Sequence, residues 1–133
     1  MTEENVELVR RLLAAFNSGD VEAVVAAFDE ECVLEEPREM PDRPTKGFRG
    51  HDGIREWMAN LLAIGEVSFE PRDITPGQGL LFMELDSRGR GAASGAPFEW
   101  TTYGVVRARG GKITRVQVFL DRSDALEAAG LAE

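Results

Sequence analysis

The chain has 133 residues, of which 43% are hydrophobic, and its formal net charge is −9. This length suits one domain, residues 1–133, because a chain of this size can bury roughly two thirds of its unfolded surface. The negative net charge argues against nucleic acid as a partner, since binding to phosphate groups depends on clustered Lys and Arg.

The first part of the chain is predicted to form two helices and a strand. Apolar residues recur at spacings of three and four from Asn5 to Phe16, which predicts a helix with one apolar face. Gly19 and Asp20 then supply a stop and a cap for a second, shorter helix with the sequence VEAVVAAFDE. The segment CVLEE follows, and its apolar, β-branched start predicts a strand that ends before Pro37.

The second part is predicted to contain one further long helix and four strands. Prolines and glycines between residues 37 and 51 predict a surface loop, after which Asp52 can cap a third helix that ends near Gly65. Beyond Gly65 the apolar period changes from that of a helix to that of a strand. The predicted strands are residues 67–75, 79–92, 97–109 and 112–121, and DALEAAG predicts a short final helix. Adjacent strands with short turns predict an antiparallel sheet in an α+β fold.

The last predicted strand, KITRVQVFLDR, alternates between two faces. One face carries Val116, Val118 and Leu120. The other carries Phe119 among polar neighbours. At the end of this strand, Asp121 is expected to cap the final helix.

The sequence contains one cysteine, Cys32, and one histidine, His51. Cys32 is expected to be a buried thiol, and His51 to lie at the surface or near a helix start. No HxxxH or CxxC spacing, no phosphate-binding loop and no run of about 18 apolar residues is found. We therefore expect a soluble cytoplasmic protein that needs no metal, no cofactor and no membrane.

Three stretches give the chain a family resemblance: RRLLAAFNSGDVEAVVAAFDEECVLEEP, FRGHDGIREWM and YGVVRARGGKITRVQVFLDRSDALEAAGL. Their order and spacing resemble the NTF2-like superfamily, in particular its SnoaL-like branch. The resemblance implies a cone with the order ααβαββββ plus a short C-terminal helix. In it, three N-terminal helices pack on a strongly curved antiparallel sheet around an apolar pocket. It also implies a homodimer through the outer sheet face, on the side of Phe119.

Ketosteroid isomerase, a member of this superfamily, suggests catalytic positions. Its base falls on Glu36, directly before Pro37, and its two oxyanion donors fall on Leu12, which cannot donate, and on Tyr103. If Glu36 enters an apolar cone, desolvation should raise its pKa toward neutrality. The alternative is a solvated carboxylate at a strand end. Strand alternation places the neighbouring Glu35 on the opposite face.

Large apolar side chains are expected to line the pocket around an apolar small molecule. The predicted ligand-binding residues are Leu12, Phe16, Phe28, Trp57, Leu61, Met83, Trp100, Val116 and Val118. Epoxide hydrolysis of the limonene type is disfavoured, because its second aspartate falls on Val118. Arg88 and Arg90 either belong to a solvated hairpin arm or contact an acidic group on a ligand.

Three functions are compatible with this sequence. The first is a SnoaL-like homodimer that binds a small molecule and catalyses proton transfer on an apolar carbonyl compound, with Glu36 as base and Tyr103 as donor. The second is a binding module without catalysis. The third is an interaction scaffold whose cone is filled by its own side chains. An open cavity faced by both Glu36 and Tyr103 would favour the first.

Overall fold

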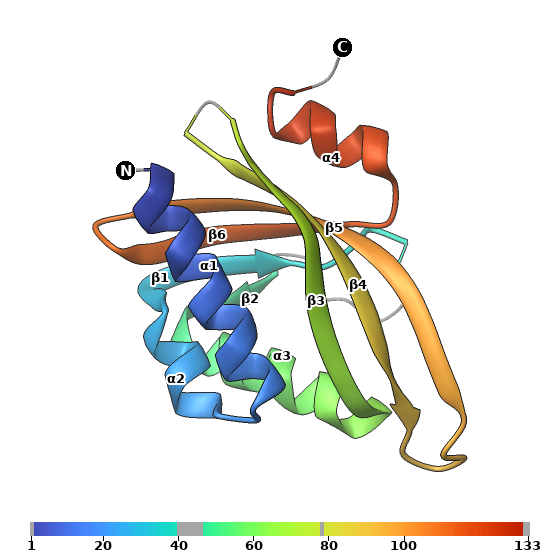
Figure 1. Cartoon of the computed structure of the whole chain (residues 1–133). Helices are drawn as coiled ribbons and strands as arrows, with labels where there is room; N and C mark the ends of the chain where they lie inside the picture. Colours follow the sequence, from blue (N-terminus) through green and yellow to red (C-terminus); the bar gives the residue numbers. More distant parts are fainter. Residues whose placement is uncertain (1, 40–46, 78, 132–133) are drawn as a thin grey trace.

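The computed structural model describes residues 2–39, 47–77 and 79–131 (Figure 1). In chain order its elements are α1 (Thr2–Asn17), α2 (Val21–Ala26), β1 (Phe28–Glu35), β2 (Phe48–Arg49), α3 (Gly50–Ile64), β3 (Gly65–Pro76), β4 (Leu81–Gly91), β5 (Pro97–Arg109), β6 (Lys112–Phe119) and α4 (Arg122–Ala128). The predicted α+β fold and the order of its long elements are confirmed. None of the described helices is long and apolar enough to cross a membrane.

The strands form one strongly curved sheet in the order β2-β1-β6-β5-β4-β3, and α1 and α3 lie against its concave side (Figure 1). Neighbouring strands are antiparallel except β1 and β6, which are parallel. The prediction of a purely antiparallel sheet is wrong for this pair. Four strands and a helix separate β1 from β6 in the chain, and a parallel pair requires a long connection of this kind.

The second helix is shorter than predicted. Asp20 accepts a hydrogen bond from the Ala23 backbone amide at 3.1 Å, as its predicted capping role requires, but α2 ends at Ala26. The chain then pairs with β6, where the Ile113 amide donates to the Ala27 carbonyl at 2.9 Å, and Phe28 opens β1. Sheet pairing thus overrides the helical pattern of the FDE segment.

The start of the third helix also differs from the prediction. The helix begins at Gly50 after Arg49, and Asp52 lies in its first turn instead of capping it. The two residues before it, Phe48 and Arg49, form the short strand β2 in a segment that was predicted to be loop. Residues 40–46, the rest of that predicted loop, lie outside the described residues.

Two apolar clusters lie on opposite faces of the sheet. The larger one fills part of the cone and includes Val9, Ile54 and Met58, all at most 1% exposed. The smaller one lies on the outer face, where α4 covers Phe82 and Val105. The space left on the concave side by the larger cluster contains the candidate site.

Candidate functional site

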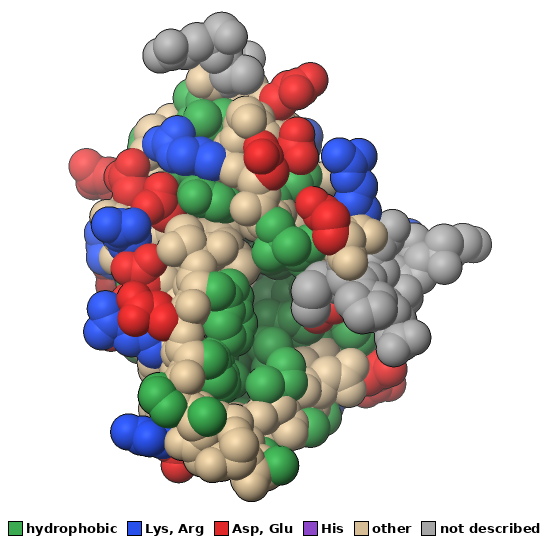
Figure 2. Space-filling view, turned by 90° about the vertical axis from the view of Figure 1, so that its right-hand side faces the viewer, with side chains coloured by type: hydrophobic (Ala, Val, Ile, Leu, Met, Phe, Trp, Pro, Cys, Tyr) green, Lys and Arg blue, Asp and Glu red, His purple; other side chains and the backbone are tan. Residues whose placement is uncertain are grey.

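A cavity of about 420 Å³ opens on the concave side of the sheet; we call it the cone cavity. Figure 2 shows a hollow whose visible walls are hydrophobic side chains. All nine residues predicted to bind a ligand line it: Leu12, Phe16, Phe28, Trp57, Leu61, Met83, Trp100, Val116 and Val118. Ile64 and Leu120 also line it and remain 49% and 43% exposed, so the cavity has an apolar rim.

The aromatic side chains that line the cavity pack against one another. The ring centroids of Phe16 and Trp57 lie 5.7 Å apart, and those of Phe16 and Phe69 lie 4.8 Å apart. Asn17, at the end of α1, fixes this corner, because its side-chain amide donates to the Phe69 carbonyl at 2.8 Å and accepts from the Phe69 amide at 2.9 Å. Phe69 was not among the predicted pocket residues, although its place in an alternating strand could have suggested it.

Strand alternation brings Glu36 into the cavity. Cys32 and Leu34 on β1 are 1% exposed and face the core, so the next residue on that face is Glu36. Glu36 lines the cone cavity beside Pro37. The neighbouring Glu35 lies on the opposite face, where its carboxylate accepts a hydrogen bond from Arg115 Nε at 2.8 Å and forms an ion pair with Nη2 at 2.6 Å. Of the two adjacent glutamates, only Glu36 therefore lines the cone cavity, as strand alternation predicted.

The Glu36 carboxyl is half-buried, and burial raises its pKa above the ordinary value of 4.5. Loss of water contact disfavours the charged form, and no opposing contact lowers the pKa. Among the described residues, none donates a hydrogen bond to this carboxyl or forms an ion pair with it. Glu36 can therefore accept a proton or a hydrogen bond from a bound molecule.

Tyr103 does not share this cavity with Glu36. Its ring stacks on Phe82 in the outer cluster, with centroids 6.2 Å apart. The predicted pairing of Glu36 with a Tyr103 donor is therefore wrong in its geometry. The pairing of β5 with β6 agrees with this placement: Arg109 pairs with Lys112 near the turn, and beyond Thr114 a β-bulge shifts the register by one residue.

The extra residue, Thr114, lies on β6, so the shift changes which β5 residue lies opposite each β6 residue beyond the bulge. With this shift, Tyr103 lies opposite Phe119 on the outer face and not opposite Val118. The side chain that faces the cavity is instead Thr102, which is 7% exposed and lines the cone cavity. Thr102 is the polar group that the sequence prediction missed.

Comparison with known proteins places this fold in a family. The family model of the SnoaL-like domain matches residues 9–116, which is most of the chain. The chain belongs to the SnoaL-like family. No curated protein matches its sequence.

Solved structures with the same fold are numerous and distant in sequence. A putative isomerase from Bacillus subtilis is 20% identical, with 98% of this chain and 96% of the other covered and a TM-score of 0.79. TerC, co-crystallised with polyporic acid, is 20% identical, with 95% and 97% covered and a TM-score of 0.78. A ketosteroid isomerase-like protein from Catenulispora acidiphila, in complex with trimethylamine, is 21% identical, with 94% and 93% covered and a TM-score of 0.72. These similarities show the NTF2-like fold of the SnoaL-like chain.

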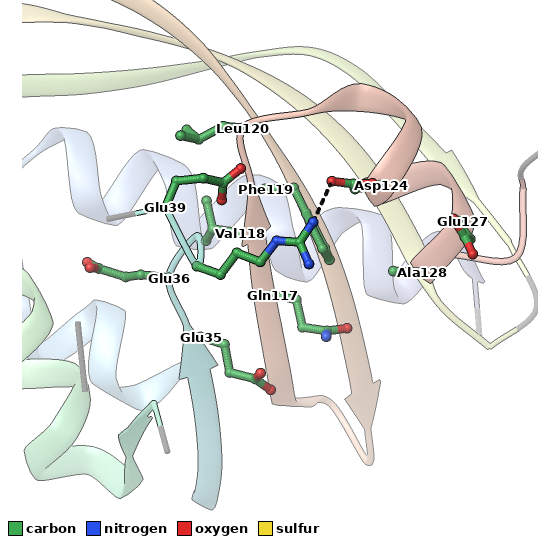
Figure 3. Close-up of a pocket in the computed structure, with 11 residues that line it drawn as sticks. Glu35, Glu36, Glu39, Gln117, Val118, Phe119, Leu120, Asp124, Glu127 and Ala128 are labelled. Atoms are coloured by element: carbon green, nitrogen blue, oxygen red, sulfur yellow. Dashed lines mark ion pairs between the residues drawn. The ribbon is translucent and has the colours of Figure 1, made fainter. Parts of the chain in front are cut away.

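A second hollow of about 620 Å³ lies between the end of β6 and α4; we call it the acidic groove (Figure 3). Its charged lining residues are Glu35, Glu36, Arg38, Glu39, Asp124 and Glu127. Arg38 and Asp124 form an ion pair at 3.7 Å, drawn as the dashed line in Figure 3. In the same view the Glu36 carboxyl points away from this pair and from Glu35. The groove is larger than the cone cavity but mainly polar, so we place the candidate site in the cone cavity.

The remaining predicted residues lie outside the cone cavity. His51 Nε2 lies 2.8 Å from the Phe28 carbonyl oxygen and joins α3 to β1. Arg90 donates to the Gly95 carbonyl at 3.2 Å, and Arg88 lies 3.9 Å from Glu99, both on the exposed hairpin arm. Asp121 accepts from the Asp124 amide at 3.0 Å and caps α4, as predicted.

Two further expectations concern metals and dimers. In the part of the chain that the structure describes, no group of three or more His, Cys, Asp or Glu could hold a metal ion. Phe119, predicted to face a partner copy, packs instead in the outer cluster beside α4. Because α4 covers the apolar part of the outer face, a homodimer would have to use what remains of it. Dimerisation stays a prediction.

Proposed function

We propose that this SnoaL-like chain binds an apolar small molecule in the cone cavity, with Glu36 as its single charged contact. One observation carries the proposal: the described residues that wall this cavity of about 420 Å³ are apolar except for Glu36, Thr101 and Thr102. Ligand pockets typically have this composition, with few polar groups that set orientation. TerC and the Catenulispora protein, which share the fold, have structures with small molecules bound.

An open cavity also argues against the scaffold alternative. A cone that served only to hold interaction surfaces would gain stability by filling its interior, because unfilled apolar volume weakens packing. Here Trp57, Trp100 and Leu61 are only half-buried, although they lie against the cavity. Bound ligand would remove their remaining apolar surface from water.

The two tryptophans of the chain provide the test, because Trp57 and Trp100 both line the cavity. N-phenyl-1-naphthylamine is uncharged at neutral pH. When it binds in the cavity, it should accept excitation energy from the two tryptophans, which is measured as fluorescence of the probe. A Kd on the order of 10 µM is expected, since this probe buries mainly apolar surface.

Val118→Phe should reduce this affinity, because it adds bulk on the cavity face. Val33→Phe is the matched control, since Val33 is also half-buried but lies outside the lining of the cone cavity. Absence of energy transfer, or equal weakening by both variants, would reject the cone cavity as the binding site.

Proton transfer is a second candidate function, favoured by the position of Glu36 in an apolar wall. The ionised Glu36 would remove a proton from the carbon beside a ketone, breaking that C–H bond, and the electron pair would move to the carbonyl oxygen as an enolate. The Thr102 hydroxyl would donate a hydrogen bond to this enolate oxygen, the role first assigned to Tyr103. Return of a proton to the carbon completes the exchange.

Deuterium exchange into the methyl group of 2-acetylnaphthalene, followed by NMR in D2O, measures this reaction. Glu36→Gln should abolish the exchange and leave affinity for the ketone largely intact, because the amide keeps the shape of the side chain but cannot accept the proton. Tyr103→Phe should leave the exchange unchanged, since Tyr103 lies on the other face. Loss of exchange in the Tyr103 variant would contradict this assignment.

A further inference from the structure

The charge of the cone cavity points to the kind of head group that a ligand carries. Glu36 is the one ionisable residue in the described lining, and no Lys, Arg or His is present there. The adjoining acidic groove contributes the carboxylates of Glu39 and Glu127, for which no ion pair is found among the described residues. An approaching molecule therefore meets a negative potential over an apolar interior.

The Glu36 carboxyl also differs from that of its neighbour in its hydrogen-bond and charge partners. A carboxylate in an apolar wall normally has a hydrogen-bond or charge partner, because losing water without one is costly. Glu35, one residue earlier, has such a partner in Arg115. Glu36 has none among the described residues. Within the described part of the chain this position is open to a partner from a ligand.

A metal ion does not suit this position. The described residues offer no cluster of three or more acidic or metal-binding side chains, and the Glu36 carboxyl points away from Glu35 and from the Arg38–Asp124 pair (Figure 3). A single carboxylate beside apolar walls matches an organic cation, whose charged nitrogen donates hydrogen bonds while its body fills the cavity.

We propose that the natural ligand is an amphiphile with a protonated amine, which pairs with Glu36 while its apolar body occupies the cone cavity. This inference rests on the proposed binding function and specifies its ligand class. An anionic ligand of the same shape is disfavoured by repulsion from Glu36, and the described lining residues include no basic side chain to offset it.

Three naphthalene compounds of nearly equal shape test the head group: 1-naphthylmethylamine, 1-naphthalenemethanol and 1-naphthoate. Each is titrated at pH 7 against protein loaded with N-phenyl-1-naphthylamine, and displacement gives its affinity. The ammonium should bind about fivefold more tightly than the alcohol, since one partly exposed charge pair contributes about 1 kcal/mol. The carboxylate should bind more weakly than the alcohol, and the ammonium preference should shrink with added salt.

Glu36→Gln and Glu35→Gln form a matched pair, because they remove the same charge from adjacent residues on opposite faces of the sheet. Glu36→Gln should bring the ammonium and the alcohol to equal affinity. Glu35→Gln should keep the preference, since that carboxylate already pairs with Arg115 outside the cavity. Binding of the uncharged probe verifies that each variant is folded.

Two failures can be told apart. If the uncharged probe binds but the ammonium and the alcohol bind equally, or if Glu36→Gln keeps the preference, the inference about the amine is overturned while the binding function stands. If neither the uncharged probe nor any naphthalene compound binds, the binding function itself is rejected.

Discussion

The two faces of the curved sheet use their apolar residues differently. On the outer face, α4 packs over Phe82 and Val105, which are 1% and 2% exposed, so this apolar surface is closed within the chain. On the inner face, Met83 and Val118 border a cavity that the chain leaves open. Closed apolar surface contributes to folding, whereas open apolar surface is available to a ligand. The outer face therefore supports stability and the inner face supports binding.

Phe82→Ala and Trp100→Ala should separate these two roles most strongly. Truncating the buried Phe82 should lower the free energy of unfolding by about 3–5 kcal/mol, because a large cavity remains. Truncating the half-buried Trp100 should cost about 1–2 kcal/mol, mostly from its ring contact with Phe98, whose centroid lies 4.8 Å away.

Probe binding should show the opposite order. N-phenyl-1-naphthylamine affinity should fall about tenfold for Trp100→Ala, which loses aromatic contact area, and change less than about twofold for Phe82→Ala. Urea unfolding and fluorescence titration measure the two effects. If Phe82→Ala impaired binding as much as Trp100→Ala, the two faces would not be functionally separate.

The sequence predicted the inner face well because its pattern is local. Apolar alternation in KITRVQVF predicted the face of Val116 and Val118, and helical spacing predicted Phe16 and Trp57. The same reasoning separated Glu35 from Glu36. Each of these predictions needs only the direction of a side chain within its own element, and no pairing with another strand.

Tyr103 was placed wrongly by the resemblance, although alternation along its own strand gives its face. Trp100 and Thr102 line the cone cavity from β5, so Tyr103 between them and the turn lies on the outer face. Counting back from the RGGK turn without the bulge places Tyr103 opposite Val118, which is wrong by one residue. The Thr114 hydroxyl donates to the Arg107 carbonyl at 3.3 Å at this irregularity. Nothing in the sequence TRVQ marks an extra residue. The bulge and the parallel pairing of β1 with β6 both depend on contacts between strands, which local patterns do not encode.

Gly104→Ala tests the inner face alone, and its effects on probe affinity and stability should be smaller. A Cβ at Gly104 would lie 2.7 Å from the terminal methyl carbon of Met83, so the flexible Met83 side chain must move. Since Met83 lines the cone cavity, we expect a smaller cavity and a several-fold weaker probe affinity. The free energy of unfolding should change by less than about 1.5 kcal/mol, because methionine readily adopts other rotamers.

Met83→Leu combined with Gly104→Ala provides the control. Leucine is shorter and leaves room for the new methyl group, so the double variant should regain most of the affinity. Unchanged affinity in the single variant would show that Met83 moves away from the cavity, and that this part of the wall does not limit the space for a ligand.

The smallest expected effect is the pH dependence of stability that Glu36 introduces on the inner face. Burial raises its pKa above 4.5, so between that value and the raised pKa the folded chain binds more protons at this site than the unfolded chain. The contribution of Glu36 to stability is therefore most favourable at low pH and declines as the pH rises through the raised pKa. Glu36→Gln removes this dependence.

Urea unfolding of both proteins at pH 4 and pH 8 measures the effect. Relative to the parent chain, the glutamine variant should be more stable at pH 8 than at pH 4, by less than about 1 kcal/mol, because the carboxyl is partly solvated. Glu35→Gln is the comparison variant, since it removes the same charge on the opposite face, where the side chain pairs with Arg115. If both variants changed the unfolding free energy equally between pH 4 and pH 8, burial at the inner position would not set the pKa of Glu36.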